Sequence, residues 1–287
     1  QVAAYEFQVD IDRIKITPTH TGKVPNTSAT AASSGSDLNG MATLEACEKI
    51  KGRLREFASE RWQTEPEKVV FLPGRVKVGS AEVTFDDLVN EAYRARVSLS
   101  ATGFYATPKI NWDKKQAKGR PFYYFAYGAA VSEVVIDTLT GENRLLRVDI
   151  LHDVGKSLNP AIDLGQIEGG FVQGVGWLTT EELWWDESGH LKTHAPSTYK
   201  IPTLGDRAPD MRMEIWEQGK NAEPTIHRSK AVGEPPLMLA ISALMALSDA
   251  INAAGDGQRY PGLDAPATPE RILAAVEHVR TLSKVAA

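Results

Sequence analysis

The sequence has little cysteine and no strong excess of charge. Its 287 residues include one cysteine, Cys47, so an intrachain disulfide or thiolate cluster is excluded and a reducing, cytoplasmic environment is expected. The formal net charge is −5, which gives no reason to expect a nucleic-acid-binding surface. The basic stretch Lys114–Arg120 is typical of a solvated loop rather than of a binding patch.

Long hydrophobic runs and several familiar catalytic patterns are also missing. The longest apolar run, Leu237–Leu247, is too short to cross a bilayer and predicts a buried helix. The N-terminus lacks a signal-peptide pattern, and its missing Met is expected of a fragment or processed subunit, or of a chain that has lost its Met. Walker and Gly-X-Ser-X-Gly motifs are absent, and the 6 histidines are scattered, so neither hydrolase chemistry nor a zinc site is supported.

Hydrophobic spacing predicts long helices mixed with hairpins. Helices are expected over residues 1–8, 38–57, 86–99, 163–178, 237–253 and from 269 onward. Strands are expected over residues 11–17, 69–72, 76–78, parts of 122–155, parts of 181–202, and 211–216. This order indicates an α+β fold rather than alternating βα units. We predict one large part over residues 1–265, followed by a C-terminal turn and helix over 266–287.

A first candidate site is the small-residue loop Thr30–Asp37, which precedes a predicted helix. Small side chains allow backbone N–H groups to approach a ligand, and a helix N-terminus favours an anion such as a phosphate or a polarised oxo group. The alternative is a simple helix cap made by Ser36 or Asp37, with nothing bound.

A second candidate is the glycine-rich helix over residues 165–176. Glycine costs helix stability, so this many glycines predict close approach of backbone or ligand. Gln166 offers an amide donor to an oxo group or a pterin edge. The alternative is a tight helix contact, through Gly165 with Gly169 and Gly170 with Gly174.

The third candidate is Glu234, which is followed by two prolines and an apolar helix. Pro235 is expected to push Glu234 out of the helical region, and the prolines suit the first turn of the helix. A carboxylate held at the N-terminus of a buried helix is suited to the role of general base. The alternative is an acidic residue that helps to cap the helix.

Taken together, these segments resemble the molybdenum-binding region of the xanthine dehydrogenase (molybdenum hydroxylase) family. The matching segments occur in the family's order and cover nearly the whole chain: residues 24–33, 98–105, 158–163, 165–169, 196–202 and 230–237. The resemblance implies the C-terminal part of the molybdenum-cofactor-binding subunit, which hydroxylates xanthine or hypoxanthine with water-derived oxygen.

The resemblance also implies a role for individual residues. Glu234 matches the general base that takes a proton from a hydroxyl group on molybdenum. The implied contacts of the molybdenum–molybdopterin cofactor are Gln166, Ala32, Ser33, Ser34, Gly35 and Gly233, with the Ala32 backbone beside the metal. Ala31 and Ala32 match neighbours of the substrate.

Partners are implied as well. The upstream half of the molybdenum-binding domain, and the iron–sulfur and FAD modules, are expected elsewhere in the same polypeptide or on other subunits, in a homo-oligomer of such assemblies. The isolated chain is therefore expected neither to turn over nor to retain the cofactor. Three alternatives stay open: a molybdenum hydroxylase acting on an aldehyde or another N-heterocycle, a non-catalytic scaffold, and a protein that binds a phosphate ligand through the Ser/Gly loop alone.

Overall fold

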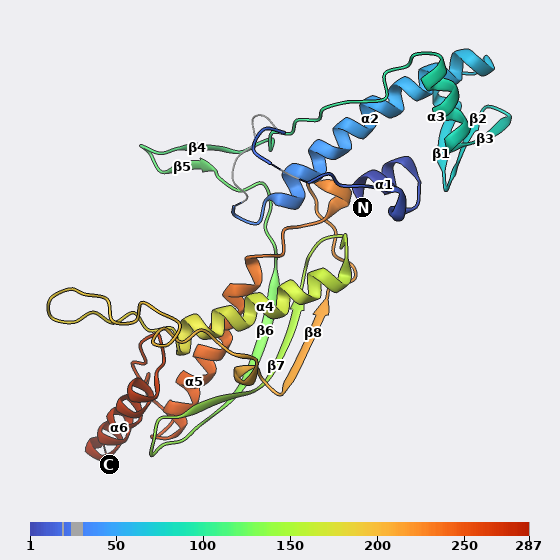
Figure 1. Cartoon of the computed structure of the whole chain (residues 1–287). Helices are drawn as coiled ribbons and strands as arrows, with labels where there is room; N and C mark the ends of the chain where they lie inside the picture. Colours follow the sequence, from blue (N-terminus) through green and yellow to red (C-terminus); the bar gives the residue numbers. More distant parts are fainter. Residues whose placement is uncertain (19, 24–30, 287) are drawn as a thin grey trace. The chain divides into compact units, whose positions relative to one another are not determined.

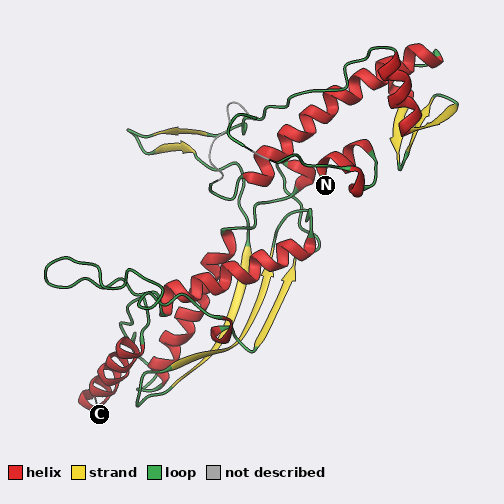
Figure 2. Cartoon of the chain, viewed as in Figure 1, coloured by secondary structure: helices red, strands yellow, loops and turns green. Residues whose placement is uncertain are grey.

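The computed structural model describes residues 1–18, 20–23 and 31–286 (Figures 1 and 2). The chain divides into two compact units. The first comprises Gln1–Tyr124 with Glu223–His227, and the second comprises Phe125–Ala222 with Arg228–Ala287. Both contain helices and antiparallel hairpins, so the predicted α+β class is confirmed. The predicted boundary at residue 265 concerns domains of the family and stays a prediction.

The first unit is built around one long helix and a small sheet. Its elements are α1 (Val2–Phe7), η1 (Ile11–Arg13), α2 (Gly35–Trp62), η2 (Pro66–Lys68), β1 (Val69–Leu72), β2 (Arg75–Val78), β3 (Ala81–Thr84), α3 (Phe85–Arg94), β4 (Asn111–Asp113) and β5 (Lys118–Arg120). The strands β1, β2 and β3 form an antiparallel sheet in that order. Its buried core is Leu54, Ala58, Val69, Val76, Val78, Leu88 and Ala92.

Most predicted elements of this unit are confirmed, but one is wrong. Residues 11–17 form the 3-10 turn η1 and an irregular segment instead of a strand. The side chain of Asp10 accepts a hydrogen bond from the Asp12 N–H, which caps the turn, and Ile16 is 89% exposed, so its alternation with polar residues reflects no buried face. The strands β3, β4 and β5 were not expected.

The second unit places two helices over one face of a three-stranded sheet (Figure 1). Its elements are β6 (Gly128–Ile136), β7 (Asn143–His152), α4 (Pro160–Thr179), η3 (Leu204–Asp206), β8 (Asp210–Ile215), η5 (Pro235–Ala240), α5 (Ile241–Ala253) and α6 (Pro269–Ala286). A further 3-10 turn, η4 (Ile226–Arg228), begins in the first unit. The sheet order is β6-β7-β8, antiparallel between β6 and β7 and parallel between β7 and β8.

The core under these helices explains why the elements stay together. The buried cluster between the sheet and helices contains Val148, Ile150, Val154, Ile167, Phe171, Leu178, Ala208 and Ala240. A second cluster joins α5 to α6 through Leu247, Ile251, Leu263, Ala267, Ile272, Ala275, Val276 and Val279. The predicted helices and the β6–β7 hairpin are confirmed. The strand expected within residues 181–202 is wrong, because that segment shows only a single bridge between Trp185 and Leu191.

One helical stretch of the described chain, Pro235–Ala253, is long and apolar enough to span a membrane by length and composition. It is longer than the apolar run Leu237–Leu247, whose length predicts a helix too short to cross a bilayer. Several of its side chains, among them Ala243, Leu247 and Ile251, are buried against the rest of the second unit. Such burial is typical of the core helix of a folded domain.

Candidate functional site

The glycines of α4 allow η5 to lie directly against it. A Cβ atom added at Gly170 would lie 3.1 Å from Pro236 Cβ and 3.6 Å from the Gly233 carbonyl oxygen. One added at Gly174 would lie 2.4 Å from the Leu237 carbonyl oxygen, well inside contact distance. The backbone from Gly233 to Leu237 therefore packs directly on the face of α4 that carries Gly170 and Gly174. The predicted tight contact through these two glycines is confirmed.

Glu234 occupies the N-cap position of η5, with Pro235 as the first residue of the helix. The predicted placement of the two prolines is confirmed, but Glu234 has φ −99° and ψ −36°, inside the helical region. The expected extended backbone is wrong, because the chain already turns here and the Leu237 N–H donates to the Glu234 carbonyl oxygen at 3.0 Å. Glu234 makes no side-chain cap, and it is exposed rather than buried. The predicted capping role of Glu234 is therefore wrong.

Gln166 lies on the same face of α4 as Gly170, one helical turn closer to the N-terminus. It is exposed. Among the described residues, no atom lies within 4 Å of a Cβ atom added at Gly165 or at Gly169. The predicted contact through these two glycines is therefore wrong for the described part of the chain, whose surface around Gln166 is open. Gln166 therefore lies one helical turn from Gly170, where an added Cβ atom would be 3.6 Å from the Gly233 carbonyl oxygen.

The predicted loop before α2 has an unusual backbone at its described residues, 31–34; residues 24–30 lie outside the described part. Ala32 and Ser33 both adopt the left-handed region, with φ of 58° and 50°, which costs non-glycine residues about 1–3 kcal/mol each. Ser34 then returns to the right-handed region and forms the N-cap of α2. Left-handed residues followed by a right-handed one turn successive N–H groups to one side, and this geometry suits an anion.

Neither Ser36 nor Asp37 is the N-cap of α2, so the predicted capping alternative is wrong. The N-cap is Ser34, and its hydroxyl donates to the Ala31 carbonyl oxygen at 2.8 Å instead of capping the helix. Asp37 accepts a hydrogen bond from the Tyr124 hydroxyl at 2.5 Å. Burial raises the pKa of Asp37, against the opposing effect of that hydrogen bond. An anion at this end of α2 would therefore not compete with a serine cap.

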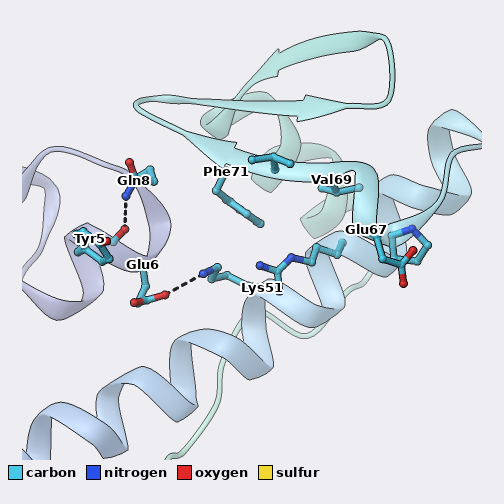
Figure 3. A pocket seen from close by; sticks show the side chains of 10 residues that line it. Tyr5, Glu6, Gln8, Lys51, Glu67, Val69 and Phe71 are labelled. Atoms are coloured by element: carbon cyan, nitrogen blue, oxygen red, sulfur yellow. Dashed lines mark hydrogen bonds and ion pairs between the residues drawn. The ribbon is translucent and has the colours of Figure 1, made fainter. Parts of the chain in front are cut away.

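The described residues form two hollows whose lining includes none of the predicted site residues. One, of about 570 Å³, is lined in the first unit by residues that include Tyr5, Arg55 and Phe71 (Figure 3). Lys51 reaches into it and pairs with Glu6 at 2.9 Å. The other, of about 410 Å³, is apolar and lies along residues 183–201. Among the described residues, no three His, Cys, Asp or Glu side chains gather as metal ligands.

Comparison with known proteins identifies the family. A model of the molybdopterin cofactor-binding domain matches residues 1–208. The chain belongs to the molybdopterin cofactor-binding domain family. Within this family, the chain is 46% identical to the xanthine dehydrogenase/oxidase of Mus musculus, in an alignment that covers 98% of this chain. It is 45% identical to the xanthine dehydrogenase of Oryza sativa over 97%. It spans about one fifth (20%) of either relative's length.

Solved structures agree on the fold of this molybdopterin cofactor-binding domain. The CO dehydrogenase of Oligotropha carboxidovorans superposes with a TM-score of 0.81 at 21% identity, over 98% of this chain and 34% of its own. The quinoline 2-oxidoreductase of Pseudomonas putida 86 superposes with a TM-score of 0.80 at 24% identity, over 97% and 34%. The predicted family and fold are therefore confirmed. The match of the family model includes Gln166 and the loop before α2 but ends before Glu234.

Proposed function

We propose that this chain contributes the general base and part of the cofactor site to a molybdenum hydroxylase that oxidises xanthine or hypoxanthine. The observation that supports this most strongly is the placement of Glu234. It is an exposed residue at the start of η5, and η5 packs on Gly170 and Gly174 of α4, the helix that carries Gln166. The identity of 46% with a xanthine dehydrogenase/oxidase supports xanthine as the substrate.

The residues present fit a molybdenum–molybdopterin cofactor. The left-handed backbone at Ala32 and Ser33 turns N–H groups toward one side, which suits the oxygen-rich, anionic character of such a group. The surface around Gln166 is open because Gly165 and Gly169 carry no side chain. We propose Ala32–Gly35, Gln166 and Gly233 as contacts of this cofactor, with the Ala32 backbone beside the metal and Ala31 and Ala32 as neighbours of the substrate.

In this proposal each residue has a defined task. When bound, the cofactor would supply two-electron redox chemistry, with iron–sulfur and flavin centres as the destination of the electrons. Gln166 donates an amide N–H that orients polar atoms at the site, and the Ala32–Gly35 backbone binds anionic groups. Glu234 takes up, at its carboxylate, the proton that is released as water-derived oxygen is transferred to the purine, which is the work of a general base.

The proposal includes the rest of the assembly. Because the chain spans 20% of its relatives' length, we propose that the upstream half of the molybdenum-binding domain and the iron–sulfur and FAD modules complete the enzyme. We propose further that such assemblies form a homo-oligomer located in the cytoplasm. The single cysteine of this chain supports the reducing compartment and not the oligomer.

The substrate is tested with the whole enzyme that contains this chain. Xanthine, hypoxanthine, an aromatic aldehyde and quinoline would be compared by kcat/KM, with incorporation of labelled oxygen from water measured by mass spectrometry. We expect labelled product and the highest kcat/KM with xanthine or hypoxanthine. A clear preference for the aldehyde or for quinoline would assign the alternative substrate class, and no hydroxylation with molybdenum bound would favour a non-catalytic scaffold.

A further inference from the structure

Lys230 and Asp153 form an ion pair inside the second unit. Lys230 Nζ lies 2.5 Å from Asp153 Oδ2, and both side chains are only 6% exposed. The Lys230 ammonium group also lies 4.9 Å from the centre of the Tyr127 ring. The other carboxylate oxygen, Asp153 Oδ1, accepts a hydrogen bond from the Gly155 N–H at 2.8 Å. Because the loss of hydration offsets much of the attraction in a buried ion pair, stability alone explains this arrangement poorly.

The backbone next to Lys230 is tied to the segment that follows Asp153. The Lys230 N–H donates to the Val154 carbonyl oxygen at 2.8 Å. Gly155 and Ser229 form an isolated antiparallel bridge, and the Asn221 side-chain amide donates to the Ser229 carbonyl oxygen at 3.0 Å. The ion pair therefore lies at a point where the chain is held by backbone and side chain together.

The other end of the same segment is held against α4. The chain runs from Lys230 through Ala231 and Val232 to Gly233 and Glu234, and from Gly233 onward it packs on the glycines of α4. The carboxylate of Glu234 itself is exposed. Residues 231–234 thus lie between two held points of the chain, the Lys230–Asp153 ion pair and the contact with α4.

We propose that the Lys230–Asp153 ion pair is a positioning device that holds the segment of residues 231–234 so that Glu234 meets the substrate site. This inference rests on the proposed role of Glu234 as the general base. A base that must stand within hydrogen-bonding reach of the reacting group gains from a backbone that cannot shift, since small misplacements cost much of the rate. Lys230 and Asp153 take no part in the proton transfer.

The chain offers a matched control for this pair. Lys51 and Glu6 form a similar ion pair in the first unit, 2.9 Å apart, with side chains 9% and 10% exposed. Neither residue belongs to the proposed site. Lys51→Met therefore removes a buried lysine of the same kind without touching the Glu234 segment.

The test uses the whole enzyme with four variants: Asp153→Asn, Lys230→Arg, the double variant Asp153→Asn with Lys230→Met, and Lys51→Met. The double variant leaves no charge buried alone, so its unfolding temperature should stay near that of the unaltered enzyme. Hydrogen exchange of the backbone amides at 231–234, bound molybdenum, and kcat and KM for xanthine would be measured together. In the double variant we expect faster exchange at 231–234 and a kcat about 10- to 100-fold lower, with KM nearly unchanged. Lys51→Met should leave both exchange at 231–234 and kcat unchanged.

The result that would overturn the proposal is unchanged exchange at 231–234 with unchanged kcat in a folded double variant. If that variant does not fold, Lys230→Arg takes its place, because it keeps the charge and changes only the fit; slower turnover with faster exchange supports the proposal, and no change contradicts it. Hydrogen exchange shows whether the Lys230–Asp153 pair holds residues 231–234, even if Glu234 proves not to be the general base. The positioning role of the pair and the catalytic role of Glu234 can therefore fail separately.

Discussion

Glu234→Gln in the whole enzyme should lower kcat for xanthine hydroxylation by about 10²- to 10⁴-fold, the usual contribution of a general base. Glutamine has the same shape as glutamate but cannot take up the proton. Because Glu234 is exposed and makes no side-chain cap on η5, the substitution should leave the fold and the bound molybdenum unchanged. Turnover and molybdenum content would be measured on the same preparation.

The matched control is Glu168→Gln on the neighbouring helix. Glu168 is two positions from Gln166 on α4 and pairs with Arg207 at 2.5 Å, with both side chains about 40% exposed. Exposed pairs of this kind contribute about 0–1 kcal/mol, so its loss should barely change kcat. Full turnover in Glu234→Gln would refute the assignment of the base, and loss of molybdenum would make Glu234 a structural residue.

Gly174→Ala should have the second largest effect, on stability and turnover together. The added Cβ atom would lie 2.4 Å from the Leu237 carbonyl oxygen and 2.6 Å from Ala240 Cβ, so η5 must move away from α4. Overpacking of this kind costs about 1–3 kcal/mol, and the obstacle here is backbone rather than a flexible side chain. Thermal unfolding and kcat would be measured, and both should fall.

Gly169→Ala on the same helix provides the control for stability. A Cβ atom added there meets nothing within 4 Å, and alanine favours a helix over glycine by about 1 kcal/mol. We therefore expect a slightly higher unfolding temperature for Gly169→Ala and a lower one for Gly174→Ala. Equal changes of the unfolding temperature in the two variants would contradict the close packing of η5 on Gly174.

The long helices could be predicted from the sequence because their apolar residues recur at helical spacing and bury one face. The core residues Leu54, Phe171 and Leu247 follow that rule. Residues 11–17 show why short segments are harder. Their alternating pattern predicts a strand, but no strand in the described part of the chain pairs with them, and the Asp10 side chain favours a turn. Pairing partners and local caps cannot be derived from alternation alone.

Some features of the candidate site could be predicted from the sequence and others could not. Gln166 and Glu234 were predicted from motifs, and Gly170 and Gly174 from the cost of glycine in a helix. The ion pair between Asp153 and Lys230 could not be predicted, because the two residues are far apart in sequence and each reads as an ordinary surface charge. The exposure of Glu234 was also missed. An apolar helix after two prolines predicts burial of the helix, but it does not decide which way the preceding carboxylate points.

The most direct test is to locate molybdenum by anomalous diffraction in crystals of the whole enzyme that contains this chain. We predict a molybdenum peak beside the Glu234 carboxylate, with the Gln166 amide directed toward the metal's ligands. A peak elsewhere, with Glu234 and Gln166 facing only solvent, would contradict it.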